Sequence, residues 1–267
     1  MSTATSPDAS SDFYSALVTA LRAAGCVFAE DEASLLMAAA ETPADLAAMV
    51  DRRIAGLPLE HVVGWAEFCG LRIAVEPGVF VPRRRTEFLA RQAIALARPS
   101  RVVVDLCCGS GAVGAVLAST VAGIELHAAD IDPAAVRCAR RNLADVGRVY
   151  EGDLFAPLPD DLRGRVDVLV ANAPYVPTGQ VALLPPEARI HEPRVALDGG
   201  MDGLDTLRRV AASAPAWLAP GGHLLVESSE QQAPDIAAVM TRGGLSANLA
   251  SCDELGATVV IGAKPEA

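Results

Sequence analysis

Apolar residues recur at helical spacing over the first part of the chain. The segments FYSALVTALRAAG, EDEASLLMAAAE and TPADLAAMVDRRIAG carry this pattern and predict helices from residue 13 to about residue 57. In the third segment, Thr42 is a candidate N-cap with Pro43 at the first helical position. The first twelve residues, MSTATSPDASSD, lack both this periodicity and the basic start and apolar core of a signal peptide. We therefore assign residues 1–58 to a disordered tail followed by a small helical domain.

The period of the pattern then shortens to two. The segment WAEFCGLRIAVEPGVFV alternates between apolar and polar residues and contains a Pro-Gly turn, which is typical of a β-hairpin. We assign residues 59–85 to a β-hairpin connector.

From residue 86 onward, strand-like and helix-like segments alternate. RVVVDL, IELHAAD, RVYEGD, VDVLVA and GGHLLVES read as strands, and helical patterns lie between most of them. Such alternation predicts an α/β fold with a mostly parallel, Rossmann-like sheet. The last two strands, SANLASC and ATVVIGAK, are too close together for a helical crossover, so an antiparallel strand is expected near the C-terminus. Residues 86–267 form this domain.

Composition narrows the class of protein. The chain is 51% hydrophobic and 21% charged, as expected of a globular protein. The net charge of −11 and the pI near 4.8 disfavour tight, non-specific nucleic-acid binding, with VPRRRTE as the best candidate for a local basic patch. The six cysteines lack metal-type spacing, so we expect no metal site and reduced thiols in a cytoplasmic protein.

One uncharged stretch, Leu106 to Ile124, has the length of a membrane span. It consists mostly of Gly, Ala, Ser, Cys and Val and starts with a glycine cluster, so its composition disfavours a membrane helix. We predict no membrane association.

Three strand ends carry chemistry that suits a nucleoside. Gly109 and Gly111 lie in a strand-to-helix turn, although the turn lacks both the Walker pattern and the full dinucleotide fingerprint, and its glycines could serve only a tight turn. Asp130 is placed to accept hydrogen bonds from a ribose diol, whereas Asp132 before a proline favours a helix N-cap. Asp153 could accept from an adenine amino group or could be a solvated turn residue. Together these positions fit adenosine without a phosphate, and hence S-adenosylmethionine better than ATP or a dinucleotide.

The next strand ends in NAPY. The side-chain carbonyl of Asn172 and the backbone carbonyl of Ala173 can each accept one hydrogen bond from an –NH2 group. Tyr175 offers an aromatic face for a planar group, and Pro174 biases Ala173 toward an extended conformation. Such a set would catalyse methyl transfer mostly by positioning. A loop that only closes a turn is the simpler alternative.

Residues from about 59 to 263 resemble the N5-glutamine methyltransferases that modify peptide-chain release factors. The motifs that carry the resemblance are LEHVVGWAEFCGLRIAVEPGVFVPRRRTE, VVVDLCCGSGAVG, ADIDPAAV, GDLF, NAPY and HEPRVALDGGMDGLD. The resemblance implies that Asn172 to Tyr175 hold the substrate glutamine amide. It also implies that the cofactor's methionine part lies over Cys107, Cys108, Gly109, Ser110 and Gly111.

This sequence departs from the family pattern at several positions. Ala173 replaces the first proline of Asn-Pro-Pro-Tyr, Cys107 replaces a glycine, and Leu154 stands where a bulky aromatic residue often follows the Asp153 position. The helical N-terminal unit also looks shorter than in the release-factor enzymes. These differences indicate a paralogue whose chemistry is better preserved than its partner.

The leading hypothesis is therefore an S-adenosylmethionine-dependent enzyme that methylates a protein glutamine, with the Gly-Gly-Gln loop of a release factor as the candidate substrate. One alternative is methylation of an exocyclic amine of DNA or RNA, which the acidic composition disfavours. Another is a binding paralogue that has lost turnover, suggested by Ala173 and Cys107. In HEPRVAL, Glu192 either lines the substrate channel or forms a loop salt bridge.

Overall fold

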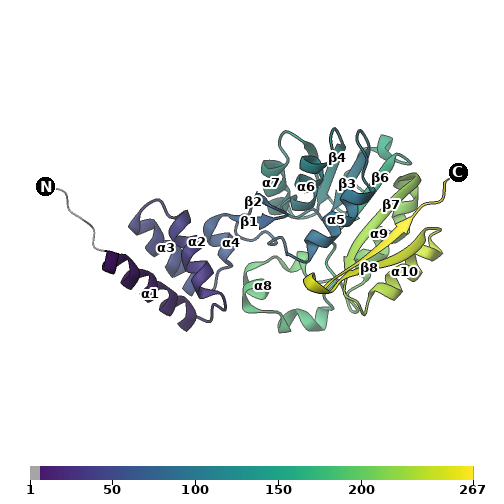
Figure 1. Cartoon of the computed structure of the whole chain (residues 1–267). Helices are drawn as coiled ribbons and strands as arrows, with labels where there is room; N and C mark the ends of the chain where they lie inside the picture. The colour runs from purple at the N-terminus through teal and green to yellow at the C-terminus, as the bar shows by residue number, and fades with distance from the viewer. Residues whose placement is uncertain (1–6, 267) are drawn as a thin grey trace. The chain divides into compact units, whose positions relative to one another are not determined.

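A computed structural model describes residues 7–266, with side chains from residue 11 onward (Figure 1). The chain forms two compact units. One comprises the residues up to Gly64 together with Pro185–His191, and the other comprises Trp65–Leu184 and Glu192 onward.

The smaller unit is helical. Its core is built from apolar side chains at helical spacing, including the fully buried Leu21 and Leu36. As predicted, the Thr42 hydroxyl caps a helix by accepting from the Asp45 amide at 3.1 Å, with Pro43 at the first helical position. The helices are α1 (Pro7–Ala23), α2 (Ala29–Ala39), α3 (Pro43–Ile54), α4 (Leu59–Val63) and α8 (Pro186–His191).

Two expectations about this unit need correction. Residues 7–12 belong to α1 instead of a disordered tail, because a proline at the first helical position and small or polar residues in the first turns are compatible with a helix. The rest of the expected tail, residues 1–6, lies outside the described residues. The start of the expected connector is α4, a helix too short to show a period in the sequence.

The larger unit contains the predicted sheet. Its strand order is β5-β4-β3-β6-β7-β9-β8. The first five strands in this order are parallel to one another, and β9 runs antiparallel to both of its neighbours, β7 and β8. This arrangement confirms the predicted fold class. The strands are β3 (Val102–Leu106), β4 (Glu125–Asp130), β5 (Gly147–Glu151), β6 (Val166–Ala171), β7 (Leu218–Ser228), β8 (Ser246–Cys252) and β9 (Ala257–Ala263).

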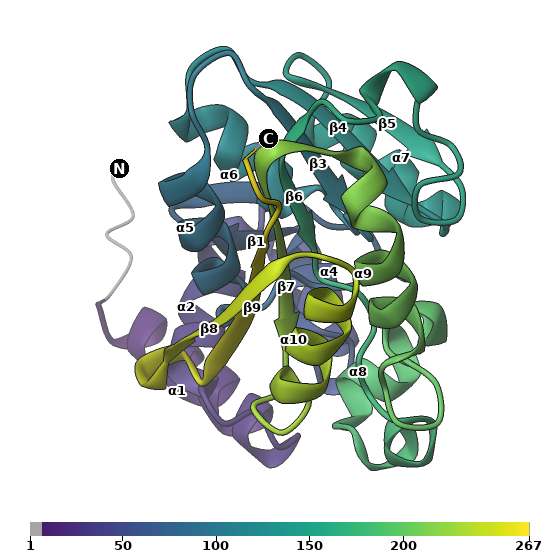
Figure 2. The ribbon, with the colours of Figure 1, turned by 90° about the vertical axis from the view of Figure 1, so that its right-hand side faces the viewer.

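Helices cover both faces of this sheet. Strand side chains alternate between the faces, so Val104 and Leu106 pack with α9 and α10 whereas Val103 packs with α5, α6 and α7. Figure 2 shows α5 and α6 on one side of the strands and α9 and α10 on the other. The helices are α5 (Thr86–Leu96), α6 (Ala112–Thr120), α7 (Pro133–Asn142), α9 (Asp205–Trp217) and α10 (Ala233–Arg242).

The predicted hairpin is present, with strands β1 (Trp65–Phe68) and β2 (Leu71–Ala74) pairing antiparallel. Its turn differs from the expectation. The turn is made by Cys69 and Gly70, which both have positive φ (49° and 77°) as a tight two-residue hairpin loop requires, and the Pro-Gly pair follows β2. Asn142 of α7 fixes the hairpin by bonding to the amide and the carbonyl of Ala74 at 3.0 and 2.9 Å.

Short 3-10 helices complete the chain: η1 (Asp160–Leu162), η2 (Thr178–Leu183), η3 (Arg194–Ala196) and η4 (Asp253–Leu255). The uncharged stretch from Leu106 to Ile124 forms the end of β3, a loop and the nine-residue α6. Within residues 7–266, no helix combines the length and hydropathy that a membrane crossing needs.

Candidate active site

The candidate site lies at the carboxyl edge of the parallel strands, where ligands bind in this class of fold. The strand register pairs Leu106 with both Ala129 and Ala171, and pairs Ala171 with Val226. The residues that directly follow these four positions therefore lie along one edge of the sheet. They are Cys107, Asp130, Asn172 and Glu227.

The glycine loop between β3 and α6 depends on left-handed backbone conformations. Cys107, Gly109 and Gly111 have φ values of 54°, 54° and 78°. A Cβ on Gly111 would come within 3.1 Å of Leu143, whereas a Cβ on Gly109 would meet no atom within 4 Å. Gly111 thus allows the helix to pack closely, and Gly109 faces open space. Cys107 adopts a conformation that is more costly for it than for glycine.

Asp130 holds this loop in place. Its Oδ2 accepts from the Gly109 amide and its Oδ1 from the Asp132 amide, both at 2.9 Å. Burial raises the pKa of the Asp130 carboxyl, and these amides oppose the rise. Each carboxylate oxygen keeps a second lone pair for an incoming hydroxyl. Asp132 is the predicted N-cap and accepts from the Ala134 amide at 2.8 Å.

The remaining loop residues are packed. Burial raises the pKa of both the Cys107 and the Cys108 thiol, and the neighbouring Asp130 raises each further, so the two thiols stay protonated. Ser110 is 2% exposed, and its carbonyl oxygen accepts from Asn142 Nδ2 at 2.8 Å. The side chain that fixes the hairpin therefore also fixes the glycine loop.

The structure gives Asp153 a protein partner. Its carboxylate pairs with Arg209 of α9, and both side chains are about half exposed. Asp153 is close enough to Cys107 to raise the pKa of that thiol. Leu154 packs against the same apolar cluster as Cys107 and Tyr175, which brings the loops after β3, β5 and β6 together.

Asn172 is anchored at one end of its amide. Its Nδ2 donates to the Thr86 hydroxyl at 3.2 Å, and its Oδ1 accepts from no described residue. Ala173 is 1% exposed, and the partly buried Pro174 leads to Tyr175. The Tyr175 hydroxyl donates to Glu227 Oε1 at 3.1 Å, and burial raises its pKa, so the hydroxyl keeps its proton.

Sequence reasoning missed two members of this group, Thr86 and Glu227. Glu227 is 2% exposed at the end of the buried strand HLLVES, and the rule that singled out polar residues at other strand ends would have found it. Thr86 is the first residue of α5, and it meets Asn172 only in the folded chain.

Glu192 forms the loop salt bridge that the sequence left as one of two possibilities. It pairs with Arg83 at 2.5 Å and accepts from the Val81 amide at 3.1 Å. The Glu192 side chain is only 1% exposed, and this buried bridge ties the HEPRVAL segment to the segment before α5.

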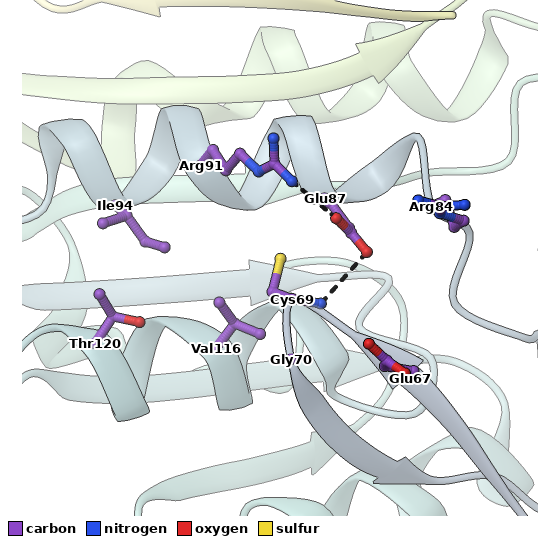
Figure 3. Close-up of a pocket in the computed structure, with 9 residues that line it drawn as sticks. All are labelled: Glu67, Cys69, Gly70, Arg84, Glu87, Arg91, Ile94, Val116 and Thr120. Atoms are coloured by element: carbon purple, nitrogen blue, oxygen red, sulfur yellow. Dashed lines mark hydrogen bonds and ion pairs between the residues drawn. The ribbon is translucent and has the colours of Figure 1, made fainter. Parts of the chain in front are cut away.

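The larger unit contains two cavities, of which one borders the site. One of about 300 Å³ is bordered by Arg85, Tyr175 and Glu227, so there is space next to the tyrosine. A larger one of about 690 Å³ lies among the β1–β2 turn, α5 and α6 (Figure 3). There Glu87 accepts from the Cys69 amide and pairs with Arg91, and none of the predicted site residues lines the cavity.

Comparison with known proteins identifies relatives and a shared fold. Residues 70–200 match the family model of the methyltransferase small domain. A release factor glutamine methyltransferase of Geobacter sulfurreducens is 38% identical over 228 residues, which cover 83% of this chain and 79% of that protein. A 4-amino-L-phenylalanine/4-methylamino-L-phenylalanine methyltransferase of Streptomyces pristinaespiralis is 39% identical over 203 residues, which cover 73% of this chain and 69% of that protein.

Among solved structures, a 16S rRNA methyltransferase of T. thermophilus in complex with AdoMet and guanosine matches with a TM-score of 0.54 and 22% identity. The match covers 75% of this chain and 49% of that one. At this level of identity the likeness shows the fold alone.

Proposed function

This chain belongs to the family of release factor glutamine methyltransferases, and from that premise we propose that it methylates the side-chain amide nitrogen of a glutamine in a peptide-chain release factor. Because release factors act on ribosomes, this proposal places the protein in the cytoplasm. The observation that carries it is the anchored amide of Asn172, which leaves a side-chain oxygen as an acceptor beside the glycine loop.

The residues at the glycine loop fit S-adenosylmethionine as the methyl donor. Space opens at Gly109, and the Asp130 carboxylate beside it has lone pairs for the two ribose hydroxyls. Asp153 lies further along the same edge, where it would accept from the adenine amino group if Arg209 shares its carboxylate. When bound, this cofactor supplies a methyl group on a positively charged sulfur, which needs no further activation.

The task left to the protein is to hold a poor nucleophile. An amide nitrogen has its lone pair delocalised into the carbonyl group. Asn172 Oδ1 and the Ala173 carbonyl would accept its two N–H bonds, and the ring of Tyr175 would pack against the amide plane. A cavity borders Tyr175 at the end of this segment. Catalysis then rests on alignment of the nitrogen with the methyl group.

A second candidate substrate is a small aromatic amine. It is favoured by the Streptomyces relative, which is as similar to this chain as the release factor enzymes are. An aromatic amine and a carboxamide share a planar nitrogen with a delocalised lone pair, so the same two acceptors could hold either one. Exocyclic amines of nucleic acids share that chemistry too, but the net charge of −11 disfavours binding of a polyanion.

Methyl transfer from labelled S-adenosylmethionine would separate these candidates. The purified protein is incubated with a bacterial release factor, with the same factor carrying a Gln→Asn change in its Gly-Gly-Gln loop, with 4-amino-L-phenylalanine, and with DNA or RNA. We expect label in the unchanged release factor alone. Equal label in both release factor forms, or label only in the small amine or the nucleic acid, would contradict the proposal. No label in any substrate would favour a binding paralogue.

The role of Asn172 gives the first prediction. Asn172→Ala should lower methyl transfer about a hundredfold or more, because the nucleophile loses an alignment contact. S-adenosylhomocysteine binding, measured by calorimetry, should change much less. A folded variant with near-normal turnover would show that Asn172 only closes a loop.

A further inference from the structure

The polarity of the Asn172 amide decides whether it can hold an –NH2 group. With Nδ2 directed at Thr86, Oδ1 is left as an acceptor for a substrate donor. With the amide turned over, Nδ2 would face the substrate and meet its N–H bonds with a donor. Something in the structure must therefore favour one of two arrangements that occupy the same space.

Thr86 alone cannot make this choice, because a hydroxyl both donates and accepts. It accepts from Asn172 Nδ2 only if its own proton is directed elsewhere. Thr86 is 3% exposed, so water is a poor acceptor for that proton. Glu227 is a charged acceptor within reach of that hydroxyl: burial raises the pKa of Glu227, and a hydrogen bond from Thr86 opposes the rise.

Glu227 is suited to this role by its position and its own contacts. The pairing of Ala171 with Val226 places Glu227 beside Asn172 on the neighbouring strand. Its Oε1 takes the Tyr175 hydroxyl at 3.1 Å and the Arg85 guanidinium at 3.3 Å. Its Oε2 is buried and has no hydrogen-bond partner among the described residues. One oxygen is thus occupied by two donors, and the other remains for Thr86.

We propose that Glu227 is a positioning residue that sets the orientation of the Asn172 amide through Thr86. An ionised carboxylate can only accept, so it draws the Thr86 proton toward Oε2. The Thr86 oxygen then presents its lone pair to Asn172 Nδ2, and Asn172 Oδ1 points to the substrate. Because Glu227 also holds the Tyr175 hydroxyl, one buried carboxylate secures both ends of the NAPY segment. This inference deepens the proposed function and rests on it.

The consequence is clearest for Glu227→Gln, because a glutamine side chain has almost the same shape as a glutamate side chain. Tyr175 and Arg85 both donate to the Oε1 position, so the new amide places its oxygen there and its –NH2 group next to Thr86. Thr86 then accepts from Gln and has no carboxylate left for its own proton. The arrangement that pairs this proton has Thr86 donate to Asn172 Oδ1, which turns the Asn172 amide over. The substitution should therefore impair the reaction through the orientation of Asn172.

The experiment compares Glu227→Gln, Thr86→Val and the conservative Thr86→Ser in methyl transfer to the release factor. We expect the Gln and Val variants to lower kcat by tenfold to about a hundredfold, with S-adenosylhomocysteine affinity unchanged. Thr86→Ser keeps the hydroxyl and should retain most of the activity. The double variant Glu227→Gln/Thr86→Val should lose no more than the poorer single variant, because both act through the same amide. A wild-type kcat for Glu227→Gln, or losses that add, would overturn the proposal.

A second measurement does not depend on the substrate. In ¹⁵N-labelled protein, the side-chain –NH2 signal of Asn172 is assigned by its loss in Asn172→Asp. Thr86→Val and Glu227→Gln should shift that signal, and Thr86→Ser should leave it close to its wild-type position. An unchanged signal in Glu227→Gln would sink the inference. If the signals move as expected but the wild-type protein methylates no amide, the proposed substrate is wrong and the orientation mechanism stands.

Discussion

Asp105 is a buried carboxyl two residues before the glycine loop, which begins at Cys107. It lies within β3, is 2% exposed, and its Oδ2 accepts from the Gly114 amide at 3.0 Å. Burial raises its pKa to about 7, so near neutral pH the folded protein tolerates its charge poorly. The carboxyl thus stays protonated well above the pH at which it would ionise in the unfolded chain.

The burial of Asp105 predicts that the difference in stability between the wild type and Asp105→Asn depends on pH. Since the folded pKa is raised, the favourable contribution of Asp105 is complete below its ordinary value of 3.8 and is lost as the pH rises through about 7. Asp105→Asn keeps an acceptor for Gly114 and cannot ionise. Urea unfolding should find the variant close to the wild type near pH 4 and more stable at pH 8, by on the order of 4 kcal/mol at most. A difference that is constant with pH would contradict the assignment.

Asp130 has two separable roles, because it holds the Gly109 amide as well as facing the proposed ribose site. Loss of cofactor affinity in a variant would therefore not identify a ribose contact by itself. We expect Asp130→Asn to weaken S-adenosylhomocysteine binding by about tenfold to a hundredfold, as the loss of a hydrogen bond to a charged group does. The informative control is the 2′-deoxy ligand measured by calorimetry. It should bind more weakly than the parent ligand to the wild type and about equally to the variant, whereas an equal penalty in both proteins would remove Asp130 from the ribose site.

At the scale of elements, one buried arginine joins three helices of the smaller unit. Arg53 of α3 pairs with Glu32 of α2 and Glu187 of α8, both at 2.6 Å. It also donates to the Leu57 carbonyl at 2.9 Å. The Arg53 and Glu32 side chains are only 8% and 10% exposed, so water cannot hydrate either charged group in place of its ion-pair partner.

Removal of this arginine should destabilise the unit strongly. Arg53→Leu leaves Glu32 buried without its cation, which costs about 3–5 kcal/mol in comparable pairs. Amide hydrogen exchange in α2 and α3 would report the loss. A control is Arg22→Leu, which removes the exposed partner of Glu30 and should have a far smaller effect. The double variant Arg53→Leu/Glu32→Leu should recover much of the loss, and a failure to recover would show that the charge is not the cause.

The sequence predicted helices and strands correctly wherever the periodic pattern of apolar residues extended over enough positions. The strand–helix alternation, the final antiparallel pair and the caps at Thr42 and Asp132 are confirmed. The hairpin turn was misplaced because Cys69 adopts a positive φ, which its residue type does not suggest. Local patterns decide secondary structure, and such exceptions depend on the surrounding fold.

For the site, the sequence identified polar residues at the ends of strands, but not the residues that hold their side chains in place. Asn172 and Asp130 follow buried apolar runs, and that position is visible in the sequence. Thr86 lies 86 residues from Asn172, and only the packing of α5 against the sheet brings them together. Their ligand roles remain predictions for the experiments above.

At the scale of the whole molecule, the chain passes between its two units three times. It leaves the helical unit after Gly64, returns at Pro185 and leaves again after His191. Residues 185–191 thus belong to the helical unit, although 120 residues of the larger unit (184 − 64) precede them. A single cut at the first crossing would not separate the units, because α8 stays attached to the larger one.

This connectivity can be tested with a protease site inserted after Gly64. We expect the cut protein to run as two fragments on a denaturing gel and to elute as one species in size-exclusion chromatography, since the contacts around Arg53 and Glu187 remain. Adding Glu187→Lys should weaken this association because it places two cations together. Separate elution of the cut but otherwise unaltered fragments would contradict the assignment of α8 to the helical unit.

The same connectivity has a consequence for synthesis on the ribosome. The helical unit receives its last segment only after the intervening 120 residues have been made. At about 5–20 residues per second, that delay is roughly 6–24 s. During this time Arg53 has Glu32 but not Glu187, so one of its two ion pairs is missing. The N-terminal helices of the nascent chain would therefore be less stable than in the finished protein until α8 emerges.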